Sequence, residues 1–167
     1  QRVERQSRNL MEAMLRITAA DLDLDSCVKT IVGVTASALN AEHVSIFYQS
    51  PSNKNLLMKV DPVPGESVLR SQQVRLGQGI AGKVAEDGGT VRVASAYMHK
   101  DFDPSVDRHE GSTNSGAILC VPIRTTPAKD PIGAIEIFGP SSANHGEGFT
   151  TAEELLMVEI GALCDSV

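Results

Sequence analysis

Gly77-Gln78-Gly79-Ile80-Ala81-Gly82-Lys83-Val84-Ala85 opens the part of the chain that decides the fold, and Gly116-Ala117-Ile118-Leu119-Cys120-Val121-Pro122-Ile123 closes it. The first stretch predicts a glycine turn into a short apolar helix over residues 80–87, and the second predicts an apolar strand. Between them runs a polar excursion, residues 95–115, with no clear helical or strand periodicity. Irregular segments of about twenty residues are uncommon in compact domains unless they carry function, so the excursion is the first place to look for a ligand.

The bulk composition is that of one globular domain. The chain has 167 residues, of which 41% are hydrophobic and 22% charged, and this is enough for a real core. The formal net charge is −6, and no basic stripe follows any expected element. Binding to nucleic acid or to an anionic membrane is therefore disfavoured.

The sequence also favours a cytoplasmic protein. Three cysteines lie far apart without a CxxC pair, which argues against a disulfide scaffold or a structural zinc site. No apolar run reaches membrane-spanning length, and no signal-peptide pattern opens the chain. The first residue is Gln1 rather than Met, so we expect a fragment of a longer protein.

Outward from the deciding stretch, the chain divides into an N-terminal helix, residues 1–20, and a domain, residues 21–167. The thin apolar stripe over residues 2–20 fits either half of a parallel coiled coil or a surface helix, and both interpretations stay open. A second helix follows the cap signal at 21–26 and ends near Asn40. Thr150 to Glu153 forms a capping-box pattern for the last helix. Strands are expected at 42–49, 56–60, 73–76, 90–93, 117–124 and 132–138.

Strands joined by short turns, with helices before and after them, predict an α+β fold with an antiparallel sheet. The terminal helices should share one face of this sheet. The helix at 80–87 and the excursion should cover the other.

No catalytic pattern stands out. Gly77-x-Gly79-x-x-Gly82 lacks the parallel βαβ context of a dinucleotide site. Cys120 is expected to be a buried, unreactive thiol. The loop carboxylates are expected to be solvated; they are Asp101, Asp103 and Asp107. The histidines lack the spacing of zinc ligands; they are His43, His99, His109 and His145. We therefore expect a non-catalytic domain that requires no metal or cofactor.

Glu136 is the exception, because it lies in an otherwise apolar strand. In one orientation it points to water, as on the wet face of an antiparallel strand. If it shares a face with Ala134 and Phe138 beneath the excursion, it forms the floor of a pocket. A buried carboxylate needs donors, which a purine N–H edge could supply. The pattern leaves both orientations open.

Several short motifs, in this order and at these intervals, resemble the GAF domains of cyclic nucleotide phosphodiesterases and related adenylyl cyclases. The motifs are Gly79-Ile80-Ala81-Gly82-Lys83-Val84-Ala85, Ser95-Ala96-Tyr97-Met98-His99-Lys100-Asp101-Phe102, Val106-Asp107, Ile118-Leu119-Cys120-Val121-Pro122-Ile123 and Gly133-Ala134-Ile135-Glu136.

The resemblance implies a six-stranded antiparallel sheet, terminal helices on one face that commonly serve dimerisation, and a small-molecule pocket on the other face. In nucleotide-binding members the purine lies over the sheet, and the cyclic phosphate meets backbone N–H groups at a helix start in the excursion. The implied ligand is cAMP or cGMP. Carried onto this sequence, the implied ligand-binding residues are Ser45, Asp61, Ile80, Ala81, Tyr97, Phe102, Asp107, Ser115 and Glu136.

The sequence departs from the family pattern after the sixth strand. Gly139-Pro140 stands where nucleotide-binding members usually carry Asn-Lys, so the usual lysine–carboxylate bridge cannot form. The Phe and acidic pair that follow are present as Phe149, Glu153 and Glu154. Ser95 replaces the usual Asp before Ala96.

Three functions stay open. The first is a regulatory domain that senses a cyclic nucleotide, forms a homodimer through its terminal helices and controls a linked output domain such as a phosphodiesterase. The second is a ligand-free GAF domain that serves dimerisation and signal coupling. The third is a free methionine sulfoxide reductase, which is disfavoured because Cys120 alone is expected near the pocket.

Overall fold

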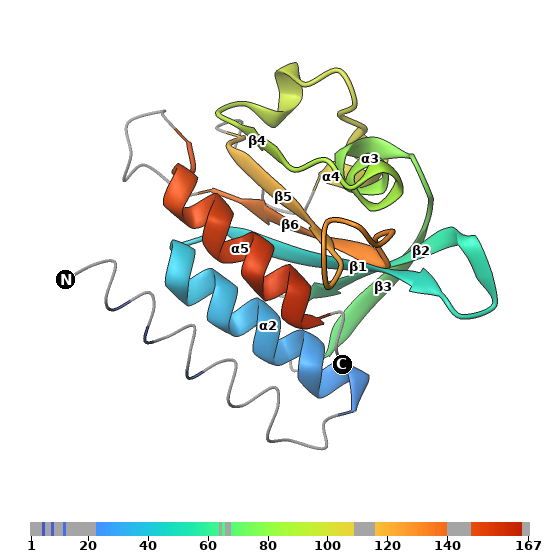
Figure 1. Ribbon diagram of the computed structural model, residues 1–167, viewed down its shortest axis with the longest axis horizontal. Helices are drawn as coiled ribbons and strands as arrows, with labels where there is room; N and C mark the ends of the chain where they lie inside the picture. The colour runs from blue at the N-terminus through green and yellow to red at the C-terminus, as the bar shows by residue number, and fades with distance from the viewer. Residues whose placement is uncertain are drawn as a thin grey trace.

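The six-stranded antiparallel sheet is confirmed. The computed structural model describes residues 23–63, 65, 68–108, 116–139 and 148–164, together with residues 5, 8 and 12. The strand order is β3-β2-β1-β6-β5-β4, and every neighbouring pair is antiparallel (Figure 1). The strands are β1 (His43–Ser50), β2 (Asn53–Pro62), β3 (Leu69–Arg75), β4 (Val91–Val93), β5 (Ile118–Ile123) and β6 (Gly133–Phe138). The helical segments are α2 (Leu24–Leu39), α3 (Gly79–Asp87), the 3-10 turn η1 (Ala96–Met98), α4 (Pro104–Asp107) and α5 (Thr151–Cys164).

Helices α2 and α5 lie side by side along one face of the sheet (Figure 1). Alternation along β1 turns Val44 and Ile46 toward this face, where they pack in one core cluster with Met157 of α5. The ends of α2 follow the sequence signals. The Asp23 side chain accepts a hydrogen bond from the Ser26 N–H (2.8 Å), and Asn40 ends the helix in the left-handed conformation.

The opposite face of the sheet carries α3, η1 and α4. Phe47 of β1, Ile80 of α3 and Val106 of α4 belong to this second core cluster. The expected division of the domain into a helical face and an excursion face is therefore confirmed for the elements that the structure describes. Within those same residues, none of the helices has the length and hydropathy needed to span a membrane.

Two expected strand boundaries were wrong. β3 begins at Leu69, whereas the sequence indicated a loop up to residue 71. This edge strand is polar and mostly exposed, so its sequence shows no apolar alternation by which it could be recognised. It is held in the sheet by backbone pairing with β2. β2 begins at Asn53 rather than residue 56, because an irregularity at Gln49/Ser50 allows Ser50 to pair with Asn53. The excursion is also less irregular than expected, since it contains η1 and α4.

Two expectations lie outside the described residues. These are the helix at 2–20, apart from residues 5, 8 and 12, and the position of Ser115.

Candidate functional site

A row of polar side chains crosses the face of the sheet beneath α3 and α4. Ser45 of β1 lies opposite Glu136 of β6, and Glu136 lies opposite Cys120 of β5. On the other side of Ser45 its hydroxyl donates a hydrogen bond to Asp61 of β2. Asp61, Ser45, Glu136 and Cys120 are called the polar row below. A continuous polar line on a buried sheet face is costly unless it is satisfied or used.

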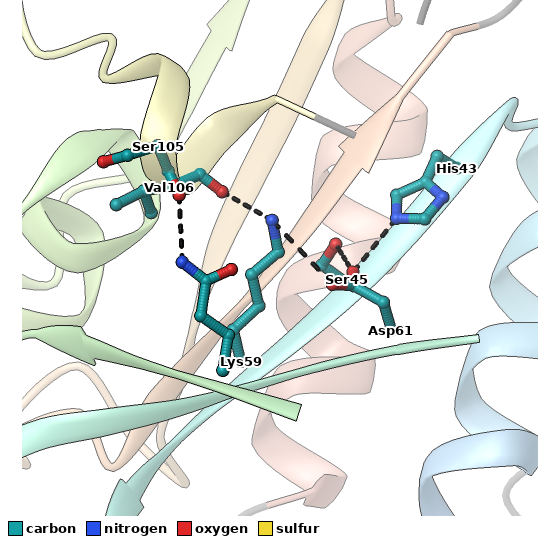
Figure 2. Close-up of polar contacts among 7 residues, drawn as sticks. His43, Ser45, Lys59, Asp61, Ser105 and Val106 are labelled. Carbon is teal, nitrogen blue, oxygen red and sulfur yellow. Dashed lines mark hydrogen bonds and ion pairs between the residues drawn. The ribbon is translucent and has the colours of Figure 1, made fainter. Parts of the chain in front are cut away.

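The Asp61 end of this row is well satisfied. Its Oδ1 atom contacts His43 Nε2 at 3.0 Å and accepts from Ser45, and its Oδ2 atom lies 3.9 Å from Lys59 Nζ (Figure 2). Burial alone would raise the pKa of Asp61. The hydrogen bond with His43, the charge of Lys59 and the hydrogen bond from Ser45 outweigh burial, so the pKa lies below its ordinary value. Asp61 is therefore a carboxylate at neutral pH.

Glu136, in contrast, is buried without a partner. Its side chain is 0% exposed, and neither carboxyl oxygen has a hydrogen-bond partner among the described residues. Burial raises its pKa well above the ordinary value, and the nearby charge of Asp107 raises it further. Glu136 belongs to the face of Ala134 and Phe138, which lie in the core cluster beneath α3. Glu136 therefore faces the excursion side of the sheet, and the water-facing orientation is excluded.

Asp107 fills the start of α3. Its carboxylate accepts hydrogen bonds from the backbone N–H groups of Ile80 (2.9 Å), Ala81 (3.3 Å) and Asp103 (2.9 Å). A helix start offers such unpaired donors and a positive dipole end, which together form an anion site. The chain's own carboxylate occupies that site here. Asp107 is 0% exposed, so the expectation of a solvated loop carboxylate was wrong for this residue.

Asp103 was also expected to be a solvated carboxylate. It is partly exposed, and it also caps α4, because its side chain accepts from the Ser105 N–H (2.9 Å).

Lys59 ties the sheet to α4. Its Nζ atom donates to the Val106 carbonyl oxygen at 2.6 Å, and the side chain is only 4% exposed (Figure 2). The ammonium also lies 5.7 Å from the centre of the Phe47 ring. A buried lysine with these contacts holds the short α4 helix down over the polar row. We call η1 and α4, residues 96–107, the lid.

The remaining predicted residues lie in the lid or outside the description. The rings of Tyr97 and Phe102 pack together with centroids 4.8 Å apart. The Tyr97 ring also covers Gly116, where an added Cβ would lie 2.8 Å from it. The structure therefore brings Ser45, Asp61 and Glu136 onto one sheet face and Ile80, Ala81 and Asp107 into one contact above it. Ser115 is not described.

Sequence reasoning missed Lys59 and His43. The signal for Lys59 was present, since strand alternation places Leu57, Lys59 and Asp61 on one face. Lysine is so often solvated that the pattern alone gave no reason to single it out.

The missing lysine–carboxylate bridge has a counterpart elsewhere. Arg92 of β4 donates from Nε to Glu154 Oε2 (2.8 Å) and from its terminal nitrogens to the Phe149 carbonyl (2.9 Å) and Thr151 Oγ1 (3.2 Å). This fork fixes the first turn of α5 to the edge of the sheet. Thr150 and Glu153 also form the expected capping box, with reciprocal contacts of 3.2 and 2.9 Å.

A pocket of about 500 Å³ lies on the helical face of the sheet, beside α2. Its described lining is mainly apolar and includes Val28, Ile31, Ile46, Ile123 and Ile132. It lacks the convergent buried polar groups that fix a ligand's orientation. The polar row beneath the lid is therefore the stronger candidate site.

The arrangement of sheet, lid and terminal helix first defines a fold class. The domain matches the GAF domain of a phosphoenolpyruvate-protein phosphotransferase from Coxiella burnetii with a TM-score of 0.76 and 18% identity, over 98% of this chain and 94% of that one. It matches free methionine-R-sulfoxide reductase from Neisseria meningitidis with a TM-score of 0.73 and 16% identity, over 99% and 89% of the two chains. At these identities the likeness shows the fold alone.

The sequence then gives the family. Residues 23–165 match the GAF domain family, and the chain belongs to it. It is 30% identical over 162 residues to dual 3′,5′-cyclic-AMP and -GMP phosphodiesterase 11A of Takifugu rubripes, covering 92% of this chain and 18% of that protein. It is also 30% identical over 145 residues to cGMP-specific 3′,5′-cyclic phosphodiesterase of Drosophila virilis, covering 80% and 16%. The chain thus spans less than a fifth of the length of these relatives.

Proposed function

We propose that this GAF domain is a regulatory sensor that binds a cyclic nucleotide between the polar row and the lid. The observation that carries the proposal is Glu136, a fully buried carboxyl group that has no hydrogen-bond donor among the described residues and lies on the same sheet face as Ser45 and Asp61. Unpaired buried polar groups are rare in folded proteins and need a cause. A heterocycle that exchanges hydrogen bonds with Glu136 supplies one.

In the described state the lid is closed. Ile80, Ala81, Asp107 and Glu136 have no exposed surface, and the α3 donors are occupied by Asp107. Ligand entry therefore requires α4 to lift, which breaks the Lys59–Val106 hydrogen bond and frees the N–H groups of α3. An anionic ligand can then replace the Asp107 carboxylate at the helix start. Exchange of one anion for another preserves the charge at that site.

The regulatory output follows from a shift between closed and open states. The relatives named above are longer enzymes, so we propose that the domain controls a linked catalytic domain in its own parent protein. The domain itself is proposed to be non-catalytic. Cys120 is its only cysteine on the polar row, and burial raises the pKa of this thiol well above its usual value, with further contributions from Glu136 and Asp107. Cys27 and Cys164 lie across the sheet on α2 and α5.

Isothermal titration calorimetry of the 167-residue chain with cAMP and with cGMP tests the proposal. We expect saturable heat with at least one nucleotide. Asp61→Asn should weaken binding about tenfold, since a buried charged hydrogen-bond partner contributes roughly 1.5–3 kcal/mol. Glu159→Gln, an exposed residue of α5 across the sheet, serves as the control and should change nothing. Absence of heat with both nucleotides at millimolar concentration contradicts the proposal.

A second candidate function is ligand-free dimerisation through the helical face. The observation that favours it is the exposure of apolar side chains on the terminal helices, with Leu24 of α2 55% exposed and Leu155 of α5 63% exposed. Sedimentation velocity separates the candidates, because a stable dimer without nucleotide binding supports this function and a monomer that binds nucleotide opposes it.

A further inference from the structure

We propose that Glu136 contacts the base of the ligand in its protonated, neutral form. The site therefore prefers a base with the hydrogen-bonding edge of adenine over one with the edge of guanine. This inference rests on the proposed function and names the base that the site prefers. It starts from the charges around Glu136 rather than from any bound molecule.

Two carboxylates and one ammonium already lie near Glu136. Asp61 lies in the polar row beside Ser45, and Asp107 faces Glu136 from α4. The ammonium is Lys59, which is occupied by the Val106 carbonyl at 2.6 Å and lies 3.9 Å from Asp61 Oδ2. Cys120, the remaining neighbour from β5, is a neutral thiol. Among the residues that the structure describes, each charged group thus has a partner and no cation is left for Glu136.

An ionised Glu136 would be a third carboxylate in this space, fully buried and without a donor. A buried charge without a donor is far more costly than a buried neutral acid. The Glu136 carboxyl group therefore keeps its proton while the lid is closed and water is absent, in keeping with the upward direction of its pKa.

A protonated carboxyl offers one O–H donor and one carbonyl acceptor side by side. The Watson–Crick edge of adenine offers the matching pair, an N6–H donor and the N1 acceptor. Guanine offers two adjacent donors, N1–H and N2–H, which suit a carboxylate and oppose a carboxylic acid. Binding of guanine at this position would therefore require Glu136 to lose its proton first.

Calorimetric titration of the wild-type chain with cAMP and with cGMP, at several values from about pH 6 to about pH 9, tests the inference. At the lowest pH we expect cAMP to bind at least about tenfold more tightly than cGMP, since a well-placed pair of base contacts discriminates by roughly this factor or more. The preference should fall as the pH rises, because ionisation of Glu136 removes the donor to N1.

Glu136→Gln is the decisive variant, because its amide carries one donor and one acceptor at every pH. We expect it to keep the preference for cAMP and to abolish the pH dependence of that preference, whereas Glu136→Ala loses the preference. Glu159→Gln makes the same chemical change on the exposed face of α5 and should behave as wild type.

A measurement without ligand provides an independent test. The infrared difference spectrum of wild type minus Glu136→Gln at neutral pH should contain the C=O stretch of a protonated carboxylic acid. A carboxylate signal in its place, or tighter binding of cGMP by the wild type, overturns the inference and leaves the proposed sensor function intact. If neither nucleotide binds, the sensor function fails and the inference fails with it.

Discussion

Replacement of Asp107 by alanine should destabilise the domain more than replacement of any other lid carboxylate. The Asp107 side chain satisfies three backbone donors, two at the start of α3 and one at the start of α4. It is 0% exposed, so water does not reach these donors in the native structure. The Asp107→Ala variant leaves all three N–H groups without their acceptor.

The expected magnitude follows from these contacts. A buried donor left without a partner costs about 1–3 kcal/mol, and loss of a carboxylate from a helix start costs about 0.3–1 kcal/mol more. At the lower end of this range the three donors together cost about 3 kcal/mol. We therefore expect a net loss of about 3 kcal/mol in the free energy of unfolding. In a domain of this size that lowers the Tm by about 6–12 °C.

Thermal unfolding followed by circular dichroism measures this shift, and Asp107→Asn is the matched variant. Its single amide oxygen can take the place of Oδ2, which accepts from Ile80 and Asp103, and only the longer contact to Ala81 is lost. We expect a loss of about 1 kcal/mol, from one impaired donor. Asp101→Ala in the same lid should stay within about 0.5 kcal/mol of wild type. A Tm shift below about 2 °C for Asp107→Ala, or equal shifts for the two Asp107 variants, would refute the reasoning.

Three further predictions follow from other contacts. Arg92→Ala removes the fork to α5 and should raise amide hydrogen exchange in the first turn of α5 while exchange in α2 stays unchanged; equal exchange in both proteins would contradict this. Gly133→Ala places a Cβ 2.0 Å from the Phe47 carbonyl oxygen and should cost about 3 kcal/mol or abolish soluble expression, so a Tm equal to wild type would be inconsistent with the observed β1–β6 register. Because the folded-state pKa of Asp61 lies below its ordinary value of 3.8, its ionised form stabilises the domain above that pH, and this stability is lost as the pH falls through the lower folded value. Urea unfolding should therefore show wild type and Asp61→Asn converging in stability below about pH 4, and a constant difference would argue against the His43–Asp61 contact.

Much of the fold could be predicted from local sequence signals. Helix caps and glycine positions have a direct backbone cause, so Asp23, Asn40 and the Thr150–Glu153 box marked real helix ends. Apolar alternation likewise assigned the two faces of β1. β3 escaped because an exposed edge strand is held by backbone pairing, which leaves no trace in side-chain hydropathy.

Several residues that the structure brings together beneath the lid were named from the sequence, but their contacts were not predicted. The resemblance selected Asp107 as a residue that closes over a ligand, and the loop composition suggested a solvated carboxylate. Neither indicated that its side chain would occupy the start of α3, because that contact joins residues 27 positions apart. The orientation of Glu136 had the same limit, since one sequence does not distinguish the two faces of a buried strand.

The Arg92 fork has a mechanical consequence. In β4 the side chains alternate, so Val91 and Val93 pack against the core cluster beneath α3, while Arg92 points to the opposite face and binds α5. β4, the strand that leads into η1, is therefore hydrogen-bonded directly to the start of α5 at the edge of the sheet. We therefore expect the lid opening proposed above to act on α5 through this contact at the edge of the sheet. Lysine at this position would transmit less force, because one ammonium cannot hold three separated acceptors as a rigid guanidinium does.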